Sequence, residues 1–166
     1  MRVRKSIAED FEGILAVIND GAQAYRGVIP DDCWHEPYMP AADLANEIAA
    51  GVEFWVAEEE EARLSGVMGI QDRGDVALVR HAYVSTERQK KGVGTALLRH
   101  VLGLTPKPVL IGTWAAASWA IDFYRRNGFT LLPESDKVRL LRRYWTISPR
   151  QIETSVVLAD SRWNSR

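Results

Sequence analysis

The sequence contains a single cysteine, Cys33, among its 166 residues, and this excludes an internal disulfide bond. Such sparse use of cysteine fits a reducing cytoplasm, where disulfides are rare. No apolar run approaches the roughly 20 residues that a membrane span needs, and no signal-peptide core follows residues 1–5. We therefore expect a cytoplasmic protein that does not associate with membranes.

The chain also lacks an excess of charge of either sign. Its formal net charge is -1, so no overall field favours nucleic acid or an anionic membrane as a partner. Hydrophobic residues make up 46% and charged residues 26% of the sequence, as in a globular domain. The length suits one hydrophobic core. We expect a single domain over residues 1–160 and a carboxy-terminal tail at 161–166.

The hydrophobic pattern predicts a mixed α/β (α+β) protein without repeats or an interdomain linker. Strands are predicted at 2–5, 54–57, 62–70, 76–84, 109–114, 129–132 and 154–159. Helices are predicted around 11–25, 44–50, 93–102, 116–126 and 134–145. The consecutive strands within 54–84 indicate antiparallel pairing. They exclude a nucleotide-binding fold that alternates strands and helices from its start. The acidic run 58–61 is interpreted as a solvated hairpin tip, not as a metal site.

A short glycine-containing loop follows the strand at 76–84 and opens directly into a helix. Gly92 and Gly94 allow a tight turn and close approach of a ligand. The first amides of the helix have no partners within the helix and carry partial positive charge, which favours phosphate binding. A glycine pair alone is more typical of an ordinary strand-to-helix turn. The loop matches neither the Walker sequence nor the dinucleotide-binding fingerprint.

Two patterns together resemble a known family. Residues 89–94 read Gln-x-x-Gly-x-Gly, and residues 120–129 read Ala-x-x-Phe-Tyr-x-x-x-Gly-Phe, with one predicted strand between them. These patterns resemble the signatures of the GCN5-related N-acetyltransferases (GNAT). The order of predicted elements over residues 2–159 is also similar to that of the family. The resemblance implies the GNAT acyltransferase fold, with a mixed and mostly antiparallel sheet of about seven strands flanked by helices.

The resemblance further implies acetyl-coenzyme A as co-substrate, with its pyrophosphate on the glycine loop. In the family the strand before this loop splays from the next strand and pairs with the pantetheine arm. The cofactor-binding residues implied are Tyr83, Val84, Arg88, Gln89, Lys90, Lys91, Gly92, Val93, Gly94, Thr95 and Ser118. Ser118 is included among these candidates because it is adjacent to Ala117, which stands where many relatives have an asparagine that contacts the cofactor arm. That contact is either absent here or supplied differently.

The resemblance assigns two catalytic roles. Tyr124 matches the tyrosine that protonates the departing thiolate, although it could also be an ordinary core aromatic. The general base is less determined, because the expected positions hold Leu78 and Arg80. His81 is the better candidate, since histidine titrates near neutrality. Strict alternation would turn His81 to the other face of the sheet unless a β-bulge redirects it. The alternative is a structural, hydrogen-bonded histidine.

The acceptor site is expected at the loop 26–40, which is rich in aromatic and titratable residues and could equally be a packed surface lid. The substrate-binding candidates are Trp34, His35, Glu36, Arg80 and Trp114, with His35 and Glu36 also considered as bases. Burying Arg80 unpaired would be costly. We expect it to pair with Glu36 or Glu53, or to bind a carboxylate or phosphate of the substrate.

The resemblance therefore predicts an N-acetyltransferase in which a primary amine attacks acetyl-coenzyme A directly in a ternary complex. The expected acceptor is a small molecule. A protein amino terminus or lysine is the alternative acceptor, and a non-catalytic acyl-coenzyme A-binding sensor is the alternative of another class. Dimers are frequent in the family, so the segment 144–163 is considered as a homodimer interface.

Overall fold

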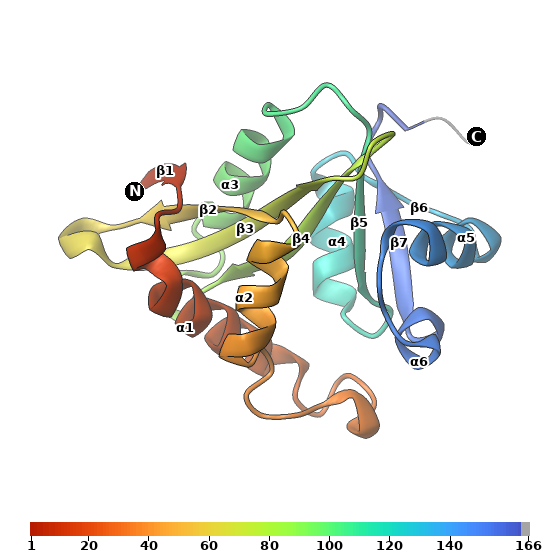
Figure 1. Ribbon diagram of the computed structural model, residues 1–166, viewed down its shortest axis with the longest axis horizontal. Helices are drawn as coiled ribbons and strands as arrows, with labels where there is room; N and C mark the ends of the chain where they lie inside the picture. The colour runs from red at the N-terminus through yellow and green to blue at the C-terminus, as the bar shows by residue number, and fades with distance from the viewer. Residues whose placement is uncertain (164–166) are drawn as a thin grey trace.

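The computed structural model describes residues 1–163 and is built around one seven-stranded sheet of order β1-β2-β3-β4-β5-β7-β6 (Figure 1). The strands are β1 (Arg2–Lys5), β2 (Glu53–Glu58), β3 (Leu64–Asp72), β4 (Ala77–Val84), β5 (Val109–Trp114), β6 (Thr130–Leu131) and β7 (Ser155–Ala159). All neighbouring strands are antiparallel except β4 and β5, which are parallel. The predicted fold class is thereby confirmed.

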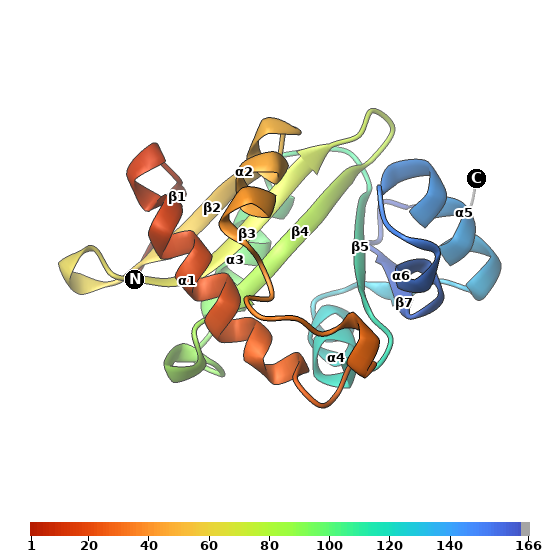
Figure 2. The same cartoon turned by 60° about the horizontal axis from the view of Figure 1, so that its bottom comes forward.

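Helices cover both faces of this sheet. They are α1 (Phe11–Gly21), α2 (Ala41–Ala49), α3 (Val93–Leu102), α4 (Ser118–Arg126), α5 (Glu134–Tyr144) and α6 (Pro149–Glu153). Figure 2 shows α1 and α2 in front of the sheet and α3 behind it. Successive side chains of a strand therefore pack on opposite faces of the sheet. Leu78 packs in the cluster under α5, whereas Val79 packs in the cluster under α3 and α4. The short helix α6 was not predicted, because five residues are too few to show a helical period.

The strands β4 and β5 separate soon after they begin. They pair only from Ala77 with Val109 to Val79 with Ile111, although β4 continues to Val84 and β5 to Trp114. Beyond that point β5 remains paired with β7 on its other side. A gap therefore opens between the second halves of β4 and β5, as the resemblance implies.

A β-bulge shapes β4 at the start of this gap. Gly69 of β3 faces Arg80 and Val67 faces Tyr83, so His81 and Ala82 together face the single residue Met68. His81 has a left-handed backbone with φ of 56°. This bulge breaks the alternation of side chains along β4 and redirects His81.

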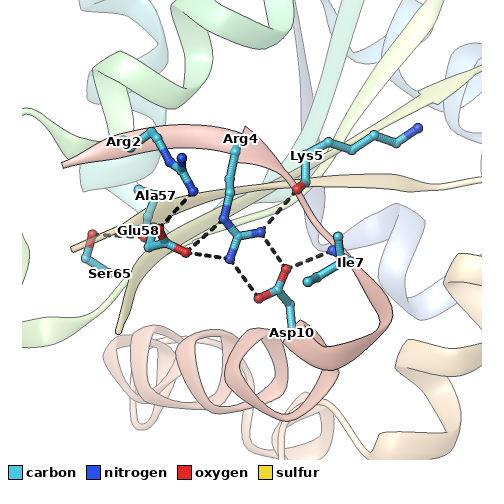
Figure 3. Close-up of polar contacts among 8 residues, drawn as sticks. All are labelled: Arg2, Arg4, Lys5, Ile7, Asp10, Ala57, Glu58 and Ser65. Atoms are coloured by element: carbon cyan, nitrogen blue, oxygen red, sulfur yellow. Dashed lines mark hydrogen bonds and ion pairs between the residues drawn. The ribbon is translucent and has the colours of Figure 1, made fainter. Parts of the chain in front are cut away.

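Polar contacts fasten the amino-terminal strand to its neighbours (Figure 3). The Arg4 guanidinium donates to both oxygens of Asp10, at 2.8 and 3.0 Å, and to Glu58 at 2.9 Å. The contact with Arg4 holds the pKa of the Asp10 carboxyl below its usual value. Arg4 thus links β1 to β2 and to the turn that precedes α1, far from the gap between β4 and β5.

The carboxy-terminal residues described by the structure pack against the domain. Arg162 bonds to Asp160 and to the carbonyl of Thr105, and Trp163 packs with Trp145 in the cluster under α5. Residues 164–166 of the expected tail lie outside the described part. The tryptophans considered for a dimer interface are thus partly buried within the chain. None of the described helices is long and apolar enough to cross a membrane.

Candidate active site

Three adjoining cavities follow the gap between β4 and β5. The loop cavity, of about 640 Å³, lies between the glycine loop, the end of β4 and α4. The neck, of about 120 Å³, lies in the gap itself. The α2 cavity, of about 650 Å³, lies between α2, the loop 32–39 and the segment 146–151.

The neck shares lining residues with both larger cavities. Tyr25, Tyr83 and Thr113 line the loop cavity and the neck. The residues that line both the neck and the α2 cavity are Tyr38, Arg80, His81, Trp114, Ile147 and Gln151. The shared residues show that the neck adjoins both large cavities, past the end of the β4–β5 pairing.

The glycine loop bends through two residues with left-handed backbone, Lys90 at φ of 62° and Gly92 at φ of 85°. A Cβ on Gly92 would meet no atom within 4 Å, so the glycine serves the backbone conformation and leaves the adjacent space open. The first helical amide bonded within α3 is that of Ala96, to the Gly92 carbonyl at 3.0 Å. The amides of residues 93–95 therefore have no partner within the helix and are available to an anion.

Residue 94 is a glycine for a different reason, which is the packing of two helices. A Cβ there would lie 3.2 Å from Cζ of Phe123, which is tighter than ordinary van der Waals contact. Gly94 therefore allows α3 and α4 to pack closely. The two glycines of the motif thus serve the loop backbone and the helix packing, respectively.

The charge of the loop cavity suits a phosphate ligand. Arg88, Lys90 and Arg126 line it, and no described Asp or Glu does. Cations together with unpaired helix amides are the groups that bind phosphate oxygens. The predicted cofactor residues that line the cavity are Tyr83, Val84, Arg88, Gln89, Lys90, Gly92, Val93, Gly94 and Thr95. Lys91 and Ser118 are exposed and are not among the lining residues, whereas Arg126, which was not predicted, is.

Tyr124 lines the loop cavity from α4 and is only 7% exposed. Its ring packs edge-on against Phe123 and Phe129, with centroids 5.3 and 5.8 Å away. Burial raises the pKa of the Tyr124 hydroxyl above its ordinary value. The hydroxyl therefore stays protonated near neutral pH and can donate a proton or a hydrogen bond.

A charged cluster lies where the neck meets the α2 cavity. Nε2 of His81 is 2.6 Å from Oε2 of Glu47, and Nη1 of Arg80 is 3.2 Å from the same oxygen. The expectation that Arg80 pairs with Glu36 or Glu53 is wrong, because its acidic partner is Glu47. The hydrogen bond with His81, aided by the charge of Arg80, holds the pKa of the Glu47 carboxyl below its usual value.

Some of the residues predicted for the acceptor site lie at the α2 cavity, and Glu36 does not. His35 lines the α2 cavity, and Trp34 stacks on Tyr38 with ring centroids 5.8 Å apart. Glu36 is exposed, pairs with Arg26 at 3.5 Å and lines none of these three cavities. Trp114 lines the α2 cavity and donates from Nε1 to the Tyr38 hydroxyl at 2.8 Å.

Sequence reasoning missed Glu47, Tyr25 and Tyr38. Glu47 lies on the polar face of α2, where nothing distinguishes it from any solvated glutamate. The two tyrosines belong to no motif and meet Tyr83 only through the fold. Their one local signal is the density of aromatic residues between positions 25 and 38.

Comparison with known proteins agrees with this geometry. An acetyltransferase (GNAT) domain model matches residues 50–131. No curated protein matches the chain. Among solved structures, a GNAT-family acetyltransferase from Staphylococcus aureus Mu50 shares 14% identity at a TM-score of 0.72, covering 96% of this chain and 97% of that one.

Two further structures show the range of relatives. The PaiA N-acetyltransferase of Thermoplasma acidophilum, solved with coenzyme A, shares 19% identity at a TM-score of 0.71, covering 96% of this chain and 97% of that one. The ribosomal-protein-S18-alanine N-acetyltransferase of Escherichia coli shares 14% identity at a TM-score of 0.66, covering 99% and 96%.

Proposed function

The chain belongs to the GNAT acetyltransferase superfamily, and from this premise we propose that it acetylates a primary amine of a small molecule bound in the α2 cavity. The donor is acetyl-coenzyme A, which supplies an acetyl group activated as a thioester. The observation that carries the proposal is the neck, which lies between a cationic loop cavity and a separate cavity bearing His81 and Glu47 and shares lining residues with both. Donor and acceptor would enter from opposite sides and meet in the gap between β4 and β5.

The loop cavity would hold the donor through groups already described. Amides of residues 93–95 would bind the pyrophosphate, with Arg88, Lys90 and Arg126 adding positive charge. The backbone of Tyr83 and Val84 borders the gap on the side where β5 has separated, so it would lie beside the amide groups of the pantetheine arm. The Val84 carbonyl also accepts a hydrogen bond from Nε2 of Gln89 at 3.3 Å. These groups bind and orient the donor, which brings the reacting atoms together.

His81 is the proposed general base. Its Nε2 is engaged by the Glu47 carboxylate, so the neutral imidazole can donate there and keep Nδ1 as an acceptor. Nδ1 would take the proton released when the acceptor nitrogen forms its bond to the acetyl carbon. Glu47 would orient the ring and stabilise its protonated form, as a carboxylate does for a catalytic histidine.

Tyr124 is the proposed general acid. As the bond between the acetyl carbon and sulfur breaks, the sulfur gains negative charge and needs a proton. A buried hydroxyl that stays protonated can supply that proton. His81 and Tyr124 line different cavities. His81 would therefore serve the acceptor nitrogen, and Tyr124 would serve the leaving sulfur.

The shape of the α2 cavity favours a small acceptor over a folded protein. Its walls come from α2, the loop 32–39 and the segment 146–151, and the Asp32–Arg150 ion pair, at 2.9 Å, links the last two across its edge. A cavity of about 650 Å³ is within the range that encloses small molecules, roughly 300–1,000 Å³. We further propose a reducing cytoplasm as the compartment, on the evidence of the single free Cys33.

A thiol-release assay with acetyl-coenzyme A tests this proposal, with products identified by mass spectrometry. The acceptor panel contains small primary amines, amino acids and peptides with free amino termini. We expect acetylation of at least one small amine at a rate well above that of every peptide. Turnover of peptides alone would overturn the proposed acceptor class. Tight coenzyme A binding with no turnover across the panel would favour a binding module.

A further inference from the structure

One edge of the Arg80 guanidinium has no partner within the described part of the chain. Nη1 lies 3.2 Å from Oε2 of Glu47 and donates to Oε1 of Gln71 at 3.4 Å. Both contacts use the same nitrogen. Nε and Nη2 make no hydrogen bond to residues 1–163, and neither is among the fully buried polar atoms that lack a partner. The edge formed by Nε and Nη2 is therefore open to a ligand.

This open edge belongs to a residue of the proposed acceptor site. Arg80 lines both the neck and the α2 cavity, and its side chain is only 16% exposed. His81 lines the same two cavities, and its Nε2 lies 2.6 Å from the same Glu47 oxygen that Arg80 contacts. The guanidinium and the imidazole thus lie side by side. A ligand bound to Arg80 would lie next to the proposed general base.

The Nε–Nη2 edge of an arginine carries two parallel N–H groups, a geometry that matches the two oxygens of a carboxylate. The α2 cavity contains one such pairing already. Arg150 donates from Nε and Nη2 to the two carboxylate oxygens of Asp32, at 2.9 and 3.1 Å. The corresponding edge of Arg80 is unoccupied, so a carboxylate from outside the chain can bind there.

The electrostatic surroundings of Arg80 also favour an additional anion. Burial lowers the pKa of the Arg80 guanidinium; the charge of Glu47 opposes this effect, and the charge of Arg73 adds to it. Glu47 is shared with His81, so its carboxylate is not a partner of Arg80 alone. A largely buried cation gains from each further anion that it contacts. A carboxylate on the acceptor would supply that contact.

We propose that the acceptor is a free α-amino acid, whose carboxylate binds Nε and Nη2 of Arg80 and whose amino group lies against His81. This inference rests on the proposed function, because it requires the acceptor to occupy the α2 cavity. One carbon separates the two groups of such an acceptor, which fits the adjacency of the two side chains. The described lining of the cavity includes three carboxylates and two guanidiniums, and this mixture of signs suits a zwitterion.

Steady-state kinetics with matched acceptors test this on the wild-type protein. The common α-amino acids are assayed, and each one that is acetylated is compared with its decarboxylated amine and its amide. The amine is more basic than the amino acid and the amide is less basic, so a preference over both does not come from basicity. We expect kcat/KM to favour the amino acid over both at least about tenfold. Equal or faster acetylation of the amines or amides would overturn the proposal.

An α-aminophosphonate identifies the acid group that the site binds. The phosphonate analogue of the accepted amino acid should react more slowly, because its second negative charge would be repelled by Glu47. A phosphonate that reacts faster than the amino acid would overturn the carboxylate as the bound group.

Variants of Arg80 localise the effect. Arg80→Gln should raise KM for the amino acid and reduce its preference over the decarboxylated amine to within about threefold, because the amine lacks the group that Arg80 binds. Arg80→Lys keeps the charge without the two-pronged edge and should keep part of the preference. Arg150→Gln is the matched control and should keep the full preference, since Asp32 already occupies its edge.

The ratio between the two acceptors separates carboxylate binding from other roles of Arg80. A structural role, or an effect through Glu47 on the base, would slow both acceptors alike. An unchanged preference in Arg80→Gln would therefore overturn the assignment. If no small amine or amino acid is acetylated, the proposed function is wrong. If small amines are acetylated without a preference for the carboxylate, only this inference is wrong.

Discussion

His81 on β4 and Glu47 on α2 meet at 2.6 Å, although 34 positions separate them in the sequence. The bulge in β4 turns His81 towards α2, and the side chains are only 17% and 23% exposed. A carboxylate paired with a histidine beside a cavity is an arrangement that supports proton transfer. The pair therefore supports the proposed role of His81 as general base, and no sequence motif indicates its partner Glu47.

Removing the imidazole should abolish most proton transfer. We expect His81→Ala to lower kcat about 100-fold while the dissociation constant of coenzyme A stays unchanged. Thiol release measures the first quantity and calorimetry the second. Full activity in His81→Ala would rule out this histidine as the base.

Glu47→Gln should lower kcat by about tenfold, since the amide can still contact His81 but no longer stabilises its protonated form. Glu53→Gln provides the matched control, because Glu53 pairs with Lys5 at 2.8 Å and lines none of the three cavities. A kcat in Glu47→Gln equal to that of the wild type would leave Glu47 with a structural role only.

Tyr124→Phe should lower kcat by about 10- to 100-fold with little effect on stability, because only a hydroxyl that donates to the leaving sulfur is lost. Tyr144 on α5 offers the control, since it is equally buried, at 6% exposed, but lines none of the three cavities. Tyr144→Phe should therefore keep full activity. If both variants behave alike in steady-state kinetics, the acid must be another group.

Gly92→Glu should weaken coenzyme A binding at least about tenfold, because it places a negative side chain in the open space beside the loop amides. Gly74 in the β3–β4 turn has nearly the same backbone, with φ of 82° against 85°, and open space as well. Gly74→Glu thus incurs the same backbone strain far from the loop. Equal affinities of the two variants for coenzyme A would contradict the proposed pyrophosphate site at the glycine loop.

The Arg4–Asp10 pair predicts a pH dependence of stability. The Asp10 pKa is lowered in the folded state, so the ion pair contributes fully to the free energy of unfolding above the unfolded pKa, about 3.9. This contribution disappears as pH falls through the lower pKa of the folded protein. Asp10→Asn should therefore cost about 2 kcal/mol in the free energy of unfolding at pH 7. This difference should shrink as pH falls below the unfolded value and vanish once the Asp10 carboxyl is protonated in the folded protein as well. Urea unfolding at several pH values measures it.

The exposed ion pair between Arg143 and Asp75 is the control for that series. Asp75→Asn should have a smaller effect on the free energy of unfolding at every pH, because solvent screens the pair. A cost of Asp10→Asn that does not depend on pH would mean that the ion pair is not its source.

The fold and most of the residues that line the loop cavity could be predicted because their signals are local. Strand and helix periods are read from neighbouring residues, and the loop around Gly92 and the segment around Tyr124 are contiguous motifs. The acceptor side depends on contacts between distant residues. Whether Glu47 or Glu53 meets Arg80 is decided by how α2 crosses the sheet, and a β-bulge decides where His81 points. Neither decision leaves a pattern in the local sequence.

A crystal structure with coenzyme A bound tests the central claim most directly, through the positions of the pyrophosphate and the sulfur. We predict the pyrophosphate at the amides of residues 93–95 and the sulfur where the loop cavity meets the neck, within about 3–4 Å of the Tyr124 hydroxyl. The α2 cavity would remain free for the acceptor. Coenzyme A in the α2 cavity, or a sulfur directed away from the gap between β4 and β5, would contradict the account.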